Sequence, residues 1–233
     1  MTLGIIGAMD EEVRALRDAL VDPAPAVVFG SPVIRGDIDG VEVLLMRSGV
    51  GKVNAALATV ALAHAGATHI VFTGMAGGIG AGVHIGDAVI ATDLVQHDVD
   101  VTAFGVQPGQ LLSESMTWQS DPPLADQLAR AFAVATANMD VSAHRGRIAS
   151  GDQFIASHTR AGEIAEQFGA IAVEMEGAAT AQVCTKLGVP FAVLRWISDT
   201  ADDAAIEDFP LFCERIAELD LAIVRALVGA VRD

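Results

Sequence analysis

The sequence predicts an α/β fold in which helices cover both faces of a central mixed β-sheet, giving a three-layer sandwich. Apolar runs of strand length alternate with segments of helical length along the 233 residues. Hydrophobic residues make up 52% of the chain but aromatic residues only 5%, so the core must be built from Ala, Val, Leu and Ile, which suits buried strands under helices. A chain of this length fits one domain, residues 1–233.

The first half of the chain begins with a buried strand at Leu3–Ala8 that turns directly into a helix. The three carboxylates of residues 10–12 favour a helix N-terminus, because the amide groups exposed there attract negative charge. The elements expected next are a strand at Val41–Met46, a helix at Val53–Ala65, a strand at His69–Thr73 that ends in a glycine cluster, and a strand at Asp87–Val95.

The second half continues the alternation, which argues for parallel strands joined by helical crossovers. The expected elements are a helix at Pro122–Met139, a strand at Arg147–Ser150, a helix at Thr159–Phe168, a strand at Ile171–Val173, a helix at Gly177–Leu187, a strand at Phe191–Ile197 and a helix at Leu211–Val231. Since ligands of such folds bind beyond the carboxyl ends of the strands, we searched those ends for functional residues.

Charge and composition exclude several functional classes. The formal charge is −16, from 30 acidic and 14 basic residues, which repels nucleic acids and anionic membranes. No apolar run is long enough to span a bilayer, and acidic residues follow the first apolar run at once, so we expect a cytoplasmic protein without an export signal. Cys184 and Cys213 have no metal-ligand spacing and are interpreted as buried hydrophobes. We expect no metal and no cofactor.

The glycine-rich segments do not match a phosphate-binding loop. Gly51-Lys52 is followed by Val53 where a phosphate loop needs Ser or Thr, and the segment from Gly74 to Gly82 lacks the dinucleotide fingerprint. The glycines therefore indicate tight turns and close packing, or a main chain that closes around a flat ligand such as a purine.

Acidic residues stand at three predicted strand ends, and each has two interpretations. Glu174 and Glu176 can be solvated charges at a helix start, or carboxylates that accept hydrogen bonds from sugar hydroxyls. Asp199 can be a helix N-cap, or a general acid positioned by the adjacent Ser198. Glu12 can be a partner of the helix dipole. The local pattern alone leaves these alternatives open.

Seven motifs in order carry a resemblance to a known family. They are Gly4-Ile5-Ile6-Gly7-Ala8-Met9 with Glu11-Glu12, Ser48-Gly49-Val50-Gly51-Lys52, Thr73-Gly74-Met75-Ala76-Gly77-Gly78, His97-Asp98-Val99-Asp100-Val101-Thr102-Ala103-Phe104-Gly105, Ser150-Gly151-Asp152-Gln153-Phe154-Ile155, Val173-Glu174-Met175-Glu176 and Arg195-Trp196-Ile197-Ser198-Asp199. Together they resemble the bacterial 5′-methylthioadenosine/S-adenosylhomocysteine nucleosidases of the nucleoside phosphorylase superfamily. The resemblance runs from residue 3 past residue 209 and implies that superfamily's α/β sandwich and a homodimer.

The resemblance also implies catalytic roles that agree with the chemistry of N-glycosidic cleavage. The ribose becomes cationic while the purine leaves as an anion, so the reaction needs a proton donor to N7 and carboxylates near the sugar. Asp199 would be the general acid, Glu12 the base that activates water, and Glu176 the acceptor of ribose hydroxyls.

Further residues are assigned to the substrate by the same resemblance. Phe154 would stack on adenine, the main chain of Ile155 would read its edge, Met175 would pack under the ribose, Phe209 would close the pocket, and Arg195 and Ser198 would support the site. Ala8, Met9, Val50, Met75, Ala76 and Gly77 complete the expected set, and Val101 and Phe104 would cover the 5′-thio group of the other subunit.

Two departures from the family pattern leave substrate preference open. Met75 stands where better-known members carry Ser, and Trp196 replaces a small residue. The alternatives are a nucleosidase of aminodeoxyfutalosine or 5′-deoxyadenosine, a phosphate-dependent phosphorylase, and an inactive purine-binding module. Glu12 argues against phosphate, because two charges 4 Å apart at an effective dielectric of 20 interact by about 4 kcal/mol. A phosphate beside Glu12 would bind roughly a thousandfold more weakly.

Overall fold

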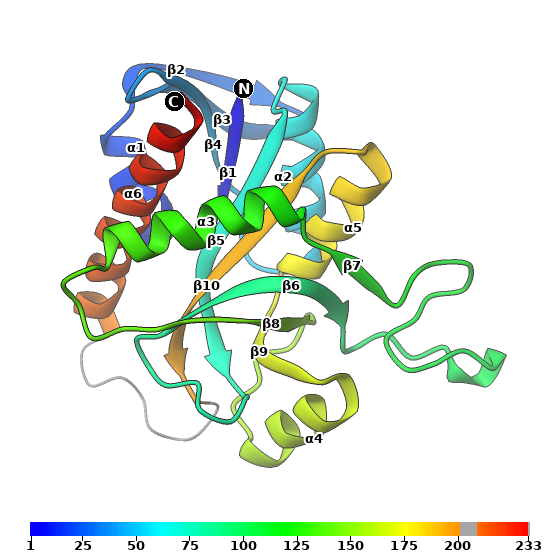
Figure 1. The fold of residues 1–233 in the computed structure, drawn as a ribbon. Coiled ribbons are helices and arrows are strands. Elements are labelled where there is room, and N and C mark those ends of the chain that lie inside the picture. Colours follow the sequence, from blue (N-terminus) through cyan, green and yellow to red (C-terminus); the bar gives the residue numbers. More distant parts are fainter. Residues whose placement is uncertain (201–208, 233) are drawn as a thin grey trace.

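All strands of the described residues belong to one mixed sheet, and helices pack on both of its faces (Figure 1). The computed structural model describes residues 1–200 and 209–232. The strands are β1 Leu3–Gly7, β2 Val21–Val28, β3 Ser31–Ile38, β4 Val41–Arg47, β5 His69–Gly78, β6 Ala88–Gln96, β7 Thr117–Gln119, β8 Ala143–Ser150, β9 Ala170–Glu174 and β10 Phe191–Asp199. The helices are α1 Asp10–Asp18, α2 Lys52–His64, η1 Thr102–Phe104, α3 Pro122–Ala135, α4 His158–Phe168, α5 Gly177–Leu187 and α6 Phe209–Arg232.

The pairing of the strands brings distant segments to one edge of the sheet. The order is β10-β6-β8-β9-β5-β1-β4-β3-β2, with β7 paired to β6. Strand β10 also pairs in parallel with β5, so the pairings among β5, β10, β6, β8 and β9 close into a ring. The strands β1, β4, β5 and β10 run in parallel, so their carboxyl ends lie at the same edge. Functional residues that follow these strands are therefore neighbours.

Two apolar layers hold the helices on the sheet. Small side chains of α2 and α5, such as Ala58 and Ala181, pack in one cluster with Ile6 and Phe72 of the sheet. Larger side chains of α1, α3 and α6 form the other layer on the opposite face, which includes Leu16. A third, smaller cluster lies under α4. The low aromatic content fits these layers, because aliphatic side chains fill both.

Helix boundaries follow local signals in the sequence. The carboxylate of Asp121 accepts a hydrogen bond from the N–H of Leu124 at 2.9 Å and caps α3, and Pro122 supplies the fixed backbone angle favoured at the first helical position. Helices α4 and α5 end at Gly169 and Gly188, whose left-handed backbone is the conformation that glycine adopts without strain.

Several element predictions were wrong in detail. The strands β2, β3 and β7 were not predicted. Strand β2 carries two prolines and is exposed almost throughout, so it lacks the alternation that marks a half-buried strand. Strand β5 continues through Gly78, where the sequence indicated turns, and α3 ends at Ala135 instead of Met139. None of the described helices is long and apolar enough to cross a membrane.

Candidate active site

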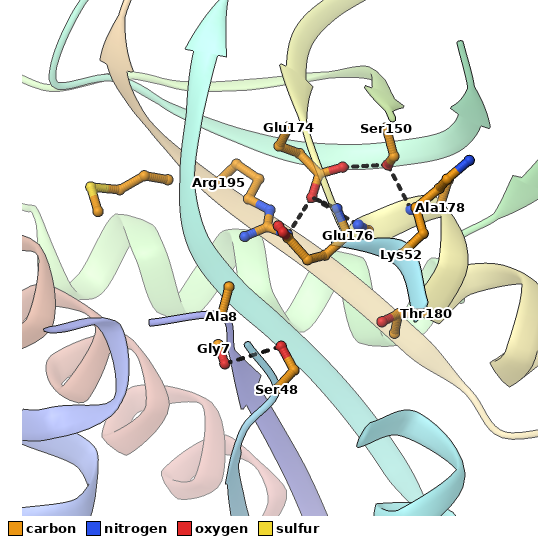
Figure 2. A network of polar contacts seen from close by, with 12 residues as sticks. Gly7, Ala8, Ser48, Lys52, Ser150, Glu174, Glu176, Ala178, Thr180 and Arg195 are labelled. Carbon is orange, nitrogen blue, oxygen red and sulfur yellow. Dashed lines mark hydrogen bonds and ion pairs between the residues drawn. The ribbon is translucent and has the colours of Figure 1, made fainter. Parts of the chain in front are cut away.

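Three buried carboxylates surround one buried arginine at the carboxyl edge of the sheet, and Figure 2 shows the arginine with two of them, Glu174 and Glu176. Glu12 comes from the first turn of α1, Glu174 from the end of β9, Glu176 from the residue before α5, and Arg195 from β10. These side chains meet because β9 pairs with the end of β5 at Gly77, while β10 pairs with β5 along its length.

The carboxylate of Glu12 turns back onto the loop before its own helix. Its Oε2 accepts hydrogen bonds from the N–H groups of Ala8 at 2.6 Å and Met9 at 3.0 Å. Its Oε1 accepts from the N–H of Met75 at 3.0 Å, which ties α1 to β5. The residue is only 3% exposed, and burial raises its pKa although Arg195 and the three N–H groups oppose the rise. A fixed carboxyl group with a raised pKa is suited to take a proton from water.

Glycine at position 74 leaves the space that Glu12 and Arg195 occupy. A Cβ atom at this position would lie 2.6 Å from Glu12 Oε1 and 2.5 Å from Arg195 Nη1. Both groups therefore face the same space beside the Gly74 backbone. Arg195 Nη1 is buried and has no hydrogen-bond partner among the described residues, so one of its donors is available in that space.

Arg195 is fully buried and its charge is balanced by the surrounding carboxylates. Its Nη2 donates a hydrogen bond to Glu174 Oε2 and lies 3.4 Å from Glu176 Oε2, while the guanidinium carbon lies 4.3 Å from the centre of the Phe72 ring. Burial lowers the pKa of Arg195, but Glu174, Glu176 and Glu12 outweigh that effect and raise it. The arginine therefore stays charged at every physiological pH.

Glu176 connects the arginine to the loop before α2. Its Oε1 accepts a hydrogen bond from the N–H of Gly51 at 2.7 Å. Burial raises its pKa to about 7; Arg195 and the Gly51 N–H oppose this, whereas the charges of Glu174 and Glu12 add to it. A carboxyl group in this position can exchange its present partners for the hydroxyl groups of a sugar.

Asp199 ends β10 and lies half-buried against β5. The Ser198 hydroxyl donates to Asp199 Oδ2 at 2.9 Å and lies 3.4 Å from the Ala76 carbonyl oxygen. A Cβ atom at Gly77 would lie 3.1 Å from Asp199 Oδ1, so the glycine lets the carboxyl group approach the strand. The predicted contact between Ser198 and Asp199 is present.

The other residues predicted for the substrate differ in exposure. Ala8 and Ile155 are buried, Met9 and Met175 are partly buried, and Val50 is exposed. The Met75 sulfur lies 3.9 Å from the thiol of Cys213, which turns this side chain toward α6. Both cysteines are buried, as predicted.

The predicted aromatic and partner-facing residues are displayed at the surface of the monomer. Phe154 is 79% exposed and Phe104 72% exposed, and Val101 is partly buried before η1. Phe209 is the first residue of α6, and its side chain lies outside the part of the chain that the structure describes.

Sequence reasoning offered Glu174 as one acceptor of sugar hydroxyls but did not include it in the expected site, and it gave Ser150 no role. The Ser150 hydroxyl donates to Glu174 Oε1 and accepts from the N–H of Ala178 at 2.7 Å, while Glu174 Oε2 accepts from the N–H of Gly177 at 2.8 Å. Glu174 thus holds Arg195 on one side and the start of α5 on the other. Their positions at the ends of the two adjacent strands β8 and β9 were the signal available in the sequence.

Trp196, the unusual residue of the last motif, points away from the carboxylates. Its ring packs in the layer of α3 and α6, 5.4 Å from the centre of the Phe132 ring, and its Nε1 donates to Asp220 Oδ1 at 2.8 Å. Its bulk therefore fills the helix layer behind β10 rather than the site. Among residues 1–200 and 209–232, no group of three or more His, Cys, Asp or Glu side chains is arranged to hold a metal ion.

Comparison with known proteins agrees with this geometry. The family model described as the phosphorylase superfamily matches residues 2–229. A 5′-methylthioadenosine/S-adenosylhomocysteine nucleosidase from Shewanella frigidimarina is 41% identical over 230 residues, which is 98% of this chain and 99% of the relative. This chain belongs to that nucleosidase family.

Solved structures of this nucleosidase family confirm the predicted fold class. The Neisseria meningitidis nucleosidase in complex with methylthio-immucillin-A matches with a TM-score of 0.90 and 37% identity, over 98% of this chain and 99% of that chain. A futalosine hydrolase mutant of Helicobacter pylori matches with a TM-score of 0.89 and 34% identity, over 99% of both chains. The sandwich is therefore nucleoside phosphorylase-like.

Proposed function

We propose that this nucleosidase hydrolyses the N-glycosidic bond of 5′-methylthioadenosine and S-adenosylhomocysteine, and also of 5′-deoxyadenosine. The products are adenine and the 5′-substituted ribose. Water adds its oxygen to C1′ as the bond to N9 breaks, and the adenine leaves protonated. The named relatives support the substrate class, and the carboxylates at the sheet edge support the chemistry.

The observation that carries the proposal is the pair of buried groups beside Gly74, Glu12 Oε1 and Arg195 Nη1, of which Nη1 has no hydrogen-bond partner among the described residues. A water molecule held between these two groups would accept a hydrogen bond from Arg195 and donate one to Glu12. Glu12 would take the proton as the water attacks C1′, which its raised pKa favours.

Asp199 is assigned the proton transfer to adenine N7, with Ser198 fixing the orientation of its carboxyl group. Phe154 would stack on the purine, and the main chain of Ile155 would read the edge of the ring. Glu176 would accept the ribose hydroxyls, and Met175 would pack beneath the sugar. Protonation of N7 neutralises the leaving group and so lowers the barrier to breaking this bond.

The charge of the site favours water over phosphate as the nucleophile. Arg195 is surrounded by three carboxylates and is itself out of contact with solvent. An entering phosphate dianion would meet Glu12 and Glu176 before it met an unbalanced positive charge. The site therefore supports hydrolysis better than phosphorolysis.

The test is adenine release from 5′-methylthioadenosine, S-adenosylhomocysteine and inosine, measured first without phosphate and then with it. We expect release from the two thioethers without phosphate and no stimulation when it is added. Turnover only with phosphate would make the protein a phosphorylase. Tight adenine binding without any turnover would indicate an inactive purine-binding module.

Glu12→Gln and Asp199→Asn test the assigned roles. We expect each to lower kcat by about a hundredfold to ten-thousandfold, because that is the usual contribution of one acid or base, with an unchanged melting curve. Glu11→Gln is the matched control, since Glu11 is exposed in the same helical turn. Full activity in either site variant would remove that residue from its role.

We further propose that the enzyme is a homodimer whose partner completes the site through Val101 and Phe104. Helix α2 presents Val53, Leu57 and Val60 to solvent at the spacing of one helix face. An apolar helix face of this kind, together with the exposed Phe104, is suited to contact with a second copy.

A second candidate substrate is aminodeoxyfutalosine. The similarity to a futalosine hydrolase supports it. Met75 supports it as well, because it stands at the position where the resemblance gives Ser, and its side chain turns toward α6. Both reactions release adenine, so comparison of kcat/KM for the two substrates ranks them directly.

A further inference from the structure

Three charged residues outside the carboxylate cluster form a closed ring of polar contacts. Lys52 Nζ donates to Asp98 Oδ1 at 2.6 Å, and Asp98 Oδ2 accepts from the N–H of Asp152 at 2.9 Å. Asp152 Oδ1 then accepts from the N–H of Lys52 at 2.8 Å, which closes the ring. Lys52 Nζ also donates to Gln96 Oε1 at 2.9 Å at the end of β6.

The Lys52–Asp98 pair of the ring is largely shielded from water, unlike the ion pairs at the surface, whereas Asp152 is exposed. The side chains of Lys52 and Asp98 are 17% and 13% exposed, whereas those of the Lys186–Glu114 pair are 53% and 32% exposed. Burial raises the pKa of Asp98, but Lys52 and the Asp152 N–H outweigh it and lower the pKa. Asp98 is therefore charged at neutral pH, and its contact with Lys52 is weakly screened.

Each member of the ring belongs to a different segment around the site. Lys52 follows Gly51, whose N–H donates to Glu176, and Figure 2 shows Lys52 beside Glu176. Asp152 precedes Phe154 and Ile155, and Asp98 opens the segment that carries Val101 and Phe104. A Cβ atom at Gly51 would lie 3.0 Å from Asp152 Oδ1, so the contact between the first two segments requires glycine there.

We propose that Lys52 is a positioning residue that sets ribose and adenine affinity by locking these three segments together through Asp98 and Asp152. The inference rests on the proposed function for the roles of Glu176, Phe154 and the partner-facing segment. The contacts of the ring lead to the segments that carry Glu176, Phe154 and Phe104, so the ring acts on substrate binding.

The test compares Lys52→Met, Lys52→Arg and Asp98→Asn in the full chain, with 5′-methylthioadenosine as substrate and adenine as a separate ligand for calorimetry. Lys52→Met keeps the length of the side chain and removes its charge, so we expect KM and the adenine Kd to rise about tenfold to a hundredfold while kcat changes less than threefold. Lys52→Arg should restore most of the affinity. Asp98→Asn, combined with Lys52→Met, should add little to the single variant.

Lys186→Met is the matched control, since it breaks a lysine–carboxylate pair of the same 2.6 Å length that is not part of the ring, and it should leave KM unchanged. Equal losses of kcat and folded protein, without a change in KM, would show a merely structural role and overturn the inference. Wild-type KM and adenine Kd in Lys52→Met would overturn it as well. If wild-type protein bound adenine but produced none from 5′-methylthioadenosine, the proposed function would fail. The adenine Kd from calorimetry would still test the role of the ring.

Discussion

Gly74, which has no side chain, is as important to the site as the charged side chains around it. The roles of Glu12 and Glu176 were predicted from the family resemblance of their motifs, because the local pattern alone left them open. The contacts that Gly74 and Glu174 make with Arg195 were not predicted, because both depend on which strands pair. A glycine in a strand gives no indication of what lies above it until β10 and α1 are placed against β5.

Gly74→Ala should therefore abolish activity and destabilise the fold. The added Cβ would displace Glu12 Oε1 or Arg195 Nη1, and disrupting a buried charge network costs about 3–5 kcal/mol. Gly162→Ala is the matched control, because no atom lies within 4 Å of the new Cβ and the position is inside α4, where alanine is favoured by up to about 1 kcal/mol. Chemical denaturation and adenine release measure the two effects; equal behaviour of the two variants would contradict this account.

At the scale of elements, α6 is fixed to β10 by the contact between Asp220 and Trp196. Asp220 is buried, and polar groups of Trp196 and Thr73 face its carboxyl group. Burial raises its pKa from 3.8 to about 7. The two polar groups and the charge of Arg195 lower the pKa, whereas the charge of Glu12 raises it. The position of α6 was predicted from its periodicity, whereas this buried pair was not, because nothing in the local pattern distinguishes Asp220 from an exposed acid.

The raised pKa of Asp220 predicts a pH-dependent stability. The folded state binds this proton more tightly than the unfolded state, so the contribution is complete below about pH 4 and is lost as pH rises through about 7. The loss is at most on the order of 4 kcal/mol, since each pKa unit corresponds to about 1.4 kcal/mol. Asp220→Asn keeps the oxygen that accepts from Trp196 and cannot ionise. Its melting temperature should exceed that of wild type by more at pH 8 than at pH 5, and a constant difference would refute this.

At the scale of the molecule, the sequence predicted a mixed sheet between helix layers but not its closure. The closing pair β5–β10 joins residues more than a hundred positions apart, and no local pattern encodes such pairing. The single domain and the dimer stay predictions.

The dimer is tested by Val53→Glu, with Val134→Glu as the control; these side chains are 79% and 69% exposed on α2 and α3.

We expect Val53→Glu to shift the protein from dimer to monomer in sedimentation experiments, because a buried unpaired charge opposes association. Adenine release should fall with dimer content, since each site needs the partner's segment. Val134→Glu should remain dimeric and active. A fully active Val53→Glu monomer would exclude a contribution from the partner.

The outer strand β2 has a consequence for how these molecules can meet. It lies at the end of the strand order and carries Pro23 and Pro25, which lack a main-chain N–H. Pro25 pairs with Ile34 of β3, whereas Pro23 lies in the irregularity between Val21 and Ala24, and proline is tolerated both on edge strands and at bulges. The row of main-chain donors on this strand is interrupted, so a neighbouring molecule cannot extend the sheet into a fibre. A finite assembly therefore has to form through the helix surfaces.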